Sequence, residues 1–207
     1  METTNIDIWK RAFPNARLED IAQCSAMVIK HYGQSNRHYH NFDHVTALIR
    51  QIIRASLIRS DENILINVAL FHDVIYIPGR KDNEHKSAEL AKKWLAILQV
   101  DTHTAQRTCA IIKATASHKS DDFLTQLFLD MDLSILGANE LNYQEYTSQI
   151  RKEHYQVPHC LYKIGRKRFL AQMLSRTTIF STPKYYKSFE KMARKNMKNE
   201  LNSLKLW

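Results

Sequence analysis

The residues with the clearest chemical potential are an adjacent imidazole and carboxylate, His72 and Asp73, which lie within an apolar segment. An apolar run from Ile64 to Phe71 precedes the pair, and Val74-Ile75-Tyr76 follows it. Ionisable groups beside a buried segment are costly unless they find a charged or hydrogen-bonding partner, and a divalent cation satisfies both groups at once. The pair therefore indicates a metal site. A buried pair held by hydrogen bonds without metal is the alternative.

Two further residues could complete such a site, His44 at the start of a predicted helix and Asp132 near the end of another. Two imidazoles and two carboxylates suit a divalent ion such as Mn, Fe, Co, Ni or Zn, with positions open for water and a substrate oxygen. Such an ion lowers the pKa of water and neutralises charge on a phosphoryl oxygen, so the set predicts hydrolysis. Spacing does not choose the metal, and Mg stays open as well.

The elements that position these residues are predicted to be helices. The chain has only four Gly and four Pro, and the apolar spacing follows a helical period with no strand alternation, so the expected class is all-α. The predicted helices cover about 6–13, 18–32, 41–57, 61–76, 82–98, 101–116, 121–137, 139–155, 161–175 and 183–205. Neighbouring helical residues diverge by about 100°. His72 and Asp73 would thus share an ion only across their common edge, with other helices closing the shell.

Length and composition predict a single domain in a cytoplasmic protein. The 207 residues lack a linker-like stretch, which favours a metal-binding core at about 18–137 followed by a C-terminal helical extension at about 138–207. The three cysteines are far apart and form no CxxC pair, so neither disulfides nor a thiolate zinc site is expected. The N-terminus has no leader-like pattern and no long apolar run occurs, so no membrane partner is predicted. The oligomeric state is left open.

The net charge of +9 is concentrated in the C-terminal part of the chain. Residues 163–207 carry 12 Lys or Arg and two Glu, whereas the preceding residues are close to neutral. A lysine stripe at helical spacing is usually the solvated face of an amphipathic helix. A nucleic-acid or acidic partner is the alternative, because clustered positive charge raises affinity for phosphate backbones.

The ordered pattern of His44, then His72-Asp73, then Asp132 resembles the HD-domain superfamily of metal-dependent phosphohydrolases. Other strings are similar to a bacterial branch of predicted HD phosphohydrolases, so that the resemblance covers most of the chain. These strings are Arg37-His38-Tyr39-His40-Asn41, Phe71-His72-Asp73-Val74-Ile75-Tyr76, Asp82-Asn83-Glu84 with Ser87-Ala88, Asp132-Leu133-Ser134-Ile135-Leu136-Gly137, Tyr143-Gln144-Glu145-Tyr146, Ile150-Arg151-Lys152-Glu153, Gly165-Arg166 and Ala193-Arg194-Lys195-Asn196. The resemblance implies an HD-type helical bundle with one ion held by those four ligands.

Each ligand has a neighbouring alternative. His38 and His40 compete with His44, and we expect His40 to support the ligands without binding the ion. Asp130 competes with Asp132, and the family string places the ligand at Asp132 with Asp130 as its support. Asp73 is expected to act in catalysis as well as in metal binding.

The proton-handling and substrate-binding residues are expected around the ligands. Glu84 is the candidate that orients or deprotonates the attacking water, with an acid that complements a helix dipole as the alternative. Arg37, Arg151 and His118 are the candidates for contact with the substrate phosphate. His118 could instead bind a second, weaker ion or be an ordinary surface histidine, and the arginines could be surface charges.

The sequence thus predicts a metal-dependent phosphohydrolase that acts on a small phosphate ester, a nucleotide or related phosphomonoester. A non-catalytic HD-fold module is the alternative, with a nucleotide in the metal pocket or RNA on the basic C-terminal helix.

Overall fold

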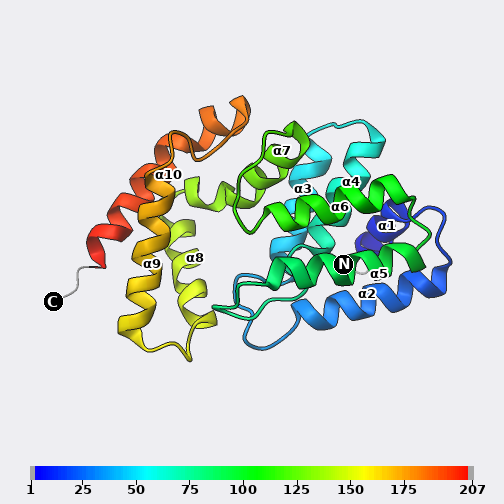
Figure 1. Cartoon of the computed structure of the whole chain (residues 1–207), viewed down its shortest axis with the longest axis horizontal. Coiled ribbons are helices and arrows are strands. Elements are labelled where there is room, and N and C mark those ends of the chain that lie inside the picture. Colours follow the sequence, from blue (N-terminus) through cyan, green and yellow to red (C-terminus); the bar gives the residue numbers. More distant parts are fainter. Residues whose placement is uncertain (1–2, 205–207) are drawn as a thin grey trace. The chain divides into compact units, whose positions relative to one another are not determined.

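The computed structural model describes residues 3–204, with side chains from Ile8 onward, and these residues form helices joined by loops. The prediction of an all-α fold is confirmed, because the described part of the chain contains ten α-helices, one short 3-10 helix and no strand (Figure 1). The chain divides into two compact units, Met1–Lys119 and Ser120–Trp207. The single domain predicted from the sequence, with a metal-binding core at about 18–137 and a C-terminal extension at about 138–207, stays a prediction.

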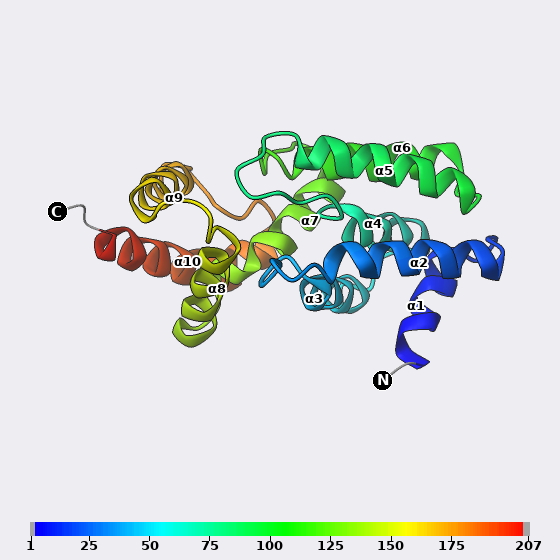
Figure 2. The same ribbon diagram turned by 90° about the horizontal axis from the view of Figure 1, so that it is seen from below.

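The first unit is organised around one central helix. Its helices are α1 (Thr3–Ala12), α2 (Leu18–Tyr32), α3 (Phe42–Arg54), α4 (Arg59–Phe71), α5 (Asn83–Ile97) and α6 (Thr102–Ala114). Helix α4 packs against α1, α3, α5 and α6, and α5 and α6 lie side by side (Figures 1 and 2). Every residue from Ile64 to Phe71 is buried. A helix covered on all sides has an apolar run in place of an amphipathic stripe, which explains that part of the sequence.

Side-chain caps precede two helices of the first unit, at positions where the sequence predicts helices to start. The Asn41 side chain accepts hydrogen bonds from the backbone N–H groups of Asp43 and His44 at the start of α3. The Asp101 carboxylate accepts from the Thr104 N–H at the start of α6. Capping of this kind depends on a few neighbouring residues, so the start of such a helix can be predicted from the sequence.

The predicted bounds of α4 are wrong at both ends. The helix begins at Arg59 after the N-cap Ile58, two residues before the predicted start, and it ends at Phe71 instead of continuing to Tyr76. His72 is the C-cap, and Asp73 lies beyond the helix. The apolar residues after His72 continue the pattern of a helix. The backbone N–H groups of Ile75 and Ile77, however, donate to the side chains of Ser87 and Asn83 in α5.

The second unit contains α7 (Phe123–Leu133), the 3-10 helix η1 (Ser134–Gly137), α8 (Glu140–Glu153), α9 (His159–Leu174) and α10 (Pro183–Ser203). Helix α10 packs along η1 and α9. A Cβ at Gly137 would lie 2.6 Å from the Phe189 Cβ, so the close approach of α10 requires glycine there. The predicted helix 121–137 is therefore two elements, α7 and η1. Between residues 3 and 204, no helix combines the length and the apolar character that a membrane crossing requires.

Candidate metal centre

The first imidazole of the site comes from the start of α3. Because Asn41 caps this helix, the backbone of its first turn is fixed, and His44 lies in that turn. The His44 side chain is buried, with 9% of the residue exposed. Its Nε2 atom lies 3.3 Å from the Nε2 atom of His72, which comes from the far end of α4. Two helices thus bring one nitrogen each to the same point.

The orientation of His72 is set by its own helix. Its Nδ1 atom lies 3.1 Å from the carbonyl oxygen of Ala69, and a carbonyl oxygen can only accept. Nδ1 therefore carries a proton and donates it to Ala69, which leaves Nε2 with a lone pair in the neutral ring. This is the arrangement found in histidines that bind metal, where the other ring nitrogen is held by a backbone or carboxylate acceptor. The side chain is almost fully buried.

The carboxylate of Asp73 adds an anionic oxygen to the two nitrogens. Its Oδ2 atom lies 3.1 Å from His72 Nε2 and 4.0 Å from His40 Nε2. A lone-pair nitrogen and a carboxylate oxygen at this separation repel each other unless a proton or a cation lies between them. Bonds of about 2.0–2.2 Å from one ion to such atoms separate them by about 3 Å. The separation of His72 Nε2 and Asp73 Oδ2 therefore fits two ligands of one divalent ion.

The backbone of Asp73 is held by two residues from α2 and the segment that follows it. Arg37 donates from Nη1 to the Asp73 carbonyl at 2.5 Å and from Nη2 to the Val74 carbonyl at 2.9 Å. The Asp73 N–H donates to the Tyr32 hydroxyl at 3.2 Å. The Arg37 guanidinium also lies over the rings of Tyr32 and Tyr76, and Arg37 is 6% exposed. Arg37 thus acts on the chain that carries the carboxylate.

These contacts give Arg37 a structural role that its residue type did not indicate. The sequence suggested Arg37 as a phosphate contact, because guanidinium groups bind phosphate well. Its Nε and Nη1 atoms also donate to the Gln34 side chain and the His40 carbonyl. The role as a phosphate contact stays a prediction, whereas the positioning of the segment after α4 is visible in the contacts. The proximity of Arg37 to His38 and His40 in the sequence was the one signal that linked it to the site.

The loop after Asp73 is tied to α5 by two buried side chains whose role was not predicted. Asn83 accepts from the Ile77 N–H at 3.1 Å and donates to the Ile77 carbonyl at 2.9 Å. The Ser87 hydroxyl contacts the Ile75 N–H and carbonyl in the same way, at 3.1 and 3.2 Å. These bonds replace those of a continued α4, which is the physical reason that the helix ends at Phe71. The recurrence of Asn and Ser four residues apart was the available signal.

The remaining candidates of the first unit lie at the ends of helices. Glu84 is half-buried in the first turn of α5, a position that suits both the predicted proton acceptor and a dipole-complementing acid. The His40 ring stacks on Tyr76 with centroids 4.2 Å apart, which holds it beside Asp73. His118 follows α6 with a φ of 49° and is half-buried. Their predicted roles stay predictions.

The candidates of the second unit lie on α7 and α8. The Asp130 carboxylate accepts from Ser181 and Thr182 before α10, and burial raises its pKa. This places Asp130 as a support for the chain that enters α10. Asp132 is half-buried, one residue before the end of α7.

Arg151 contacts the chain that follows its own helix. Its Nη1 atom donates to the carbonyls of His154 and Val157, and its guanidinium lies over the Tyr162 ring. Arginine near a helix C-terminus commonly bonds the last carbonyls in this way. The predicted phosphate contact of Arg151 is not tested by these bonds.

By the chemistry of their donor atoms, His44, His72 and Asp132 could together hold a metal ion, whose identity the residues do not decide. Comparison of the chain with protein-family models, curated proteins and solved structures gives no match.

Proposed function

We propose that this chain is a metal-dependent phosphohydrolase of the HD type, in which His44, His72, Asp73 and Asp132 hold one divalent ion. The observation that carries the proposal is the approach of His44 Nε2 and Asp73 Oδ2 to His72 Nε2, at 3.3 and 3.1 Å. Asp132 is included on the strength of its place in the HD pattern and its carboxylate.

The chemistry follows from what each residue can do. When bound, a divalent ion at these ligands would supply Lewis acidity, lowering the pKa of water and neutralising charge on a phosphoryl oxygen. His72 would keep its lone pair on the ion side because Ala69 holds its Nδ1 proton. His40 would steady the Asp73 carboxylate, and Glu84 would accept the proton of the attacking water.

The proposed substrate is a small phosphate ester, a nucleotide or related phosphomonoester. His118 and Arg151 are proposed contacts to its phosphate, because an imidazole and a guanidinium can donate to anionic oxygens. Arg37 is proposed to act through Asp73, since it donates to the Asp73 and Val74 carbonyls and to the Gln34 side chain. A second, weaker ion near His118 would be seen as a second binding event in metal titration.

The proposal is tested by elemental analysis of the purified protein together with a phosphatase screen over nucleotides and phosphomonoesters with Mn, Co, Ni, Zn or Mg. We expect turnover that a chelator abolishes and that Asp73→Asn and Asp132→Asn each reduce by at least about 100-fold. Asp121→Asn, an exposed aspartate, is the matched control and should keep the parent's rate. Chelator-insensitive turnover would contradict the mechanism. Stoichiometric metal without turnover of any substrate would contradict the enzyme and favour the HD-fold binding module.

A further inference from the structure

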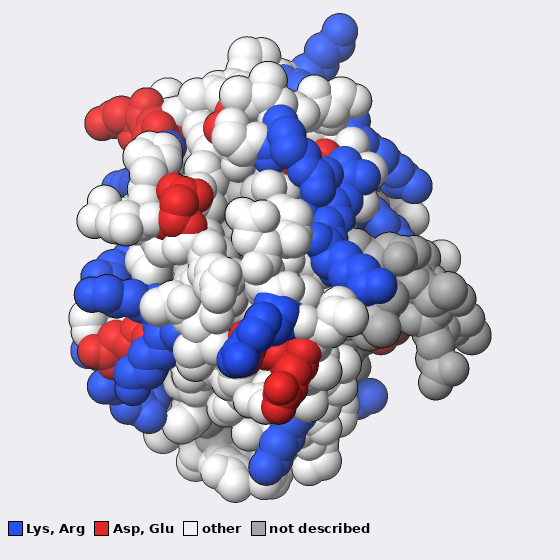
Figure 3. All heavy atoms as spheres, turned by 90° about the vertical axis from the view of Figure 1, so that its right-hand side faces the viewer, with Lys and Arg blue, Asp and Glu red and all other residues white. Residues whose placement is uncertain are grey.

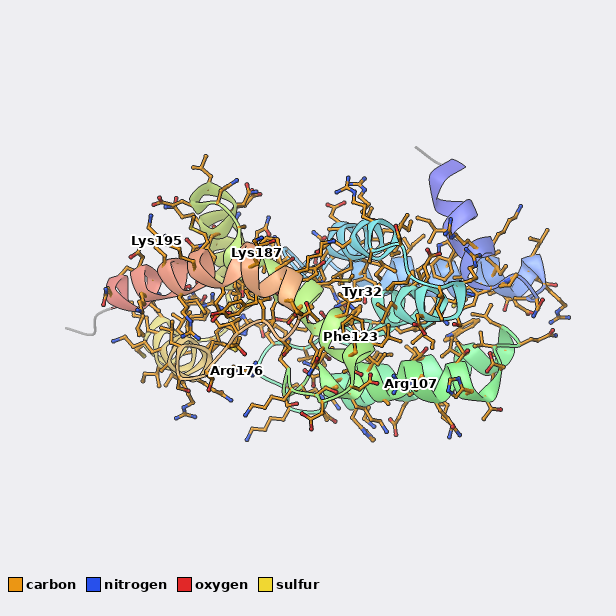
Figure 4. All side chains as sticks on the ribbon, turned by 90° about the horizontal axis from the view of Figure 1, so that it is seen from above. Tyr32, Arg107, Phe123, Arg176, Lys187 and Lys195 are labelled. Atoms are coloured by element: carbon orange, nitrogen blue, oxygen red, sulfur yellow. The ribbon has the colours of Figure 1, made fainter. Side chains whose placement is uncertain are left out.

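Helix α10 carries five exposed lysines in a single row. Their spacing along the chain is three, four, four and three residues, which at 100° per residue places them within an arc of about 80°. At 1.5 Å per residue, the row is about 21 Å long. Lys187 and Lys195, labelled in Figure 4, belong to it. The lysine row consists of Lys184, Lys187, Lys191, Lys195 and Lys198.

The opposite face of α10 is fixed against the second unit. Tyr185, Ala193 and Met197 are buried on that face. The Asn196 side chain, also buried there, donates to the carbonyls of Leu136 and Ala138 at 3.0 and 2.8 Å. The rotation of the helix about its axis is therefore set by packing and by hydrogen bonds, and the lysine row is held toward solvent.

The two glutamates of α10 do not neutralise the row, because both bond to inward-facing groups. Glu190 accepts from the Ile179 and Phe180 N–H groups, and Glu200 accepts from Arg166. Within residues 8–204, no ion pair involves a lysine of the row. The row is thus a line of five positive charges with no acid beside it.

Exposed charge in the first unit is arranged differently. Arg80 pairs with Asp82, and Lys86 pairs with Glu89. The face shown in Figure 3 likewise carries basic and acidic side chains interspersed. Paired surface charges create little net field, whereas an unpaired line of one sign attracts a polyanion along its length.

We propose that the lysine row binds the phosphate backbone of a nucleic-acid duplex without reading its sequence. Successive lysines are about 4.5–6 Å apart along the helix axis, a regular spacing that suits a regular line of phosphates. The row contains no aromatic or aliphatic side chain. Exposed Tyr186 and Met192 lie outside its arc, about 100° or more from its centre.

The lack of apolar side chains in the lysine row argues against two other polyanions, single-stranded nucleic acids and anionic membranes. Proteins that bind single strands stack the bases on aromatic side chains, which the lysine row lacks. Helices that lie on membranes insert Trp, Phe or Leu beside their basic residues, and these are lacking in the row as well. A duplex offers phosphates at its surface and hides its bases, so it matches a row of charge alone. This surface would act independently of the metal centre.

The test measures binding of the full chain to a fluorescent duplex of about 24 base pairs over a range of salt concentration. DNA and RNA duplexes of one sequence, the single strands, and vesicles with anionic lipid are the probes. If all five lysines contact phosphates, a plot of log K against log[salt] should have a slope of about −4.5. Lys187→Gln, Lys191→Gln and Lys195→Gln combined should reduce the slope to about −1.8.

The matched control removes the same charge elsewhere. Lys92→Gln, Lys93→Gln and Lys113→Gln combined replace three exposed lysines of α5 and α6 and should leave the slope close to that of the parent. Equal loss in the two triple variants would overturn the proposal, since net charge alone would then explain binding. Tighter binding to single strands or to vesicles than to either duplex would also overturn it. Tighter binding to one of the two duplexes would support the proposal and show whether the lysine row binds DNA or RNA.

Discussion

Each unit of the molecule buries a polar cluster. The groups of the cluster in the second unit bond to one another, and we call it the closed cluster. Arg166 donates from Nε and Nη2 to the Glu200 carboxylate at 2.7 and 3.0 Å, and the Tyr143 hydroxyl donates to the same carboxylate at 2.5 Å. Arg166 Nη1 donates to the Tyr146 hydroxyl, and the guanidinium lies over the Tyr146 and Phe169 rings. Every charge in this cluster has a partner of opposite sign or a matching hydrogen-bonding group.

The cluster of the first unit brings together atoms that can bind a cation. His44 Nε2 and Asp73 Oδ2 lie 3.3 and 3.1 Å from His72 Nε2, and the Nδ1 proton of His72 is held by Ala69. We call these three atoms the acceptor cluster. Burying such groups is unfavourable unless a cation or proton joins them. Burial of polar groups alone therefore does not indicate a functional site. The kind of group is more informative, because imidazole nitrogens and a carboxylate oxygen at these distances are atoms that a divalent cation can join, whereas Arg166 and Glu200 neutralise each other.

The largest expected effect is the stabilisation of the first cluster by metal. The parent should gain about 4 kcal/mol of unfolding free energy at a free metal concentration 1,000 times its dissociation constant. His72→Ala combined with Asp73→Ala removes two of the acceptor atoms and should abolish this gain. Thermal and chemical unfolding with and without metal, together with elemental analysis, measure it.

The matched control for that experiment uses the same residue types on the surface. His103→Ala combined with Asp121→Ala should retain the metal-dependent gain, because both residues are exposed. A double variant at His72 and Asp73 that bound metal as tightly as the parent would show that the acceptor cluster is not the ligand set.

Breaking the closed cluster should affect stability and leave metal binding intact. Arg166→Met leaves the Glu200 carboxylate buried without its cation, which typically costs about 3–5 kcal/mol of unfolding free energy. Adding Glu200→Leu removes the orphaned charge and should recover most of that loss. Metal affinity, measured by titration at a temperature where each variant is folded, should stay within about twofold of the parent.

A result in which Arg166→Met alone abolished metal binding in the folded protein would end the distinction between the clusters. Recovery of stability by the double variant, with metal affinity unchanged throughout, would support that distinction. The closed cluster would then contribute to stability alone and not to metal binding.

Much of the fold was predictable from the sequence because the residues that start and end a helix are close to it in the chain. The bounds of α2 were predicted as Leu18 and Tyr32, and the starts of α3 and α6 were predicted to within one residue. The end of α4 was not predictable in this way. It depends on bonds from Asn83 and Ser87 to a loop that, by its apolar composition alone, continues the helix.

The site was predictable to the extent that chemistry follows from residue type. An imidazole and a carboxylate after an apolar run indicate a buried acceptor pair, and the structure does bring His44 to His72. The contacts of Arg37 were not predictable, because a guanidinium suits phosphate and backbone carbonyls alike. Only the fold shows that it lies against the Asp73 and Val74 carbonyls and is almost fully buried.

Arg37 offers a finer test of how the acceptor cluster is held. Arg37→Lys keeps the charge and removes the planar fork that reaches two carbonyls at once. If Arg37 positions Asp73, metal affinity should fall by about 10–100-fold, as for residues that orient metal ligands. Arg50→Lys, an exposed arginine of α3, is the control and should bind metal as the parent does.

The alternative role for Arg37 predicts a different pattern. A residue that contacts only the substrate phosphate would raise KM and leave metal affinity unchanged. Metal titration of Arg37→Lys therefore separates positioning from substrate contact even before a substrate is known.

The smallest expected effect concerns a single hydrogen bond of the closed cluster and its dependence on pH. Burial, and next to it the Glu200 carboxylate, raise the pKa of the Tyr143 hydroxyl above its ordinary value of 10.0. Because the folded pKa exceeds the unfolded one, this contribution to stability is fully present below pH 10.0 and is lost as pH rises beyond it. Tyr143→Phe removes the donor and should lower the unfolding free energy by about 1 kcal/mol at neutral pH.

Chemical denaturation at neutral pH and above pH 10.0 should show the parent and Tyr143→Phe converging in stability, since alkali removes from the parent what the variant already lacks. Tyr186→Phe changes a half-exposed tyrosine of α10 and should follow the parent at every pH. If the difference between Tyr143→Phe and the parent did not shrink as pH rises, the Tyr143 proton would not be part of the cluster's stability. The network would then depend on the ion pair of Arg166 and Glu200 alone.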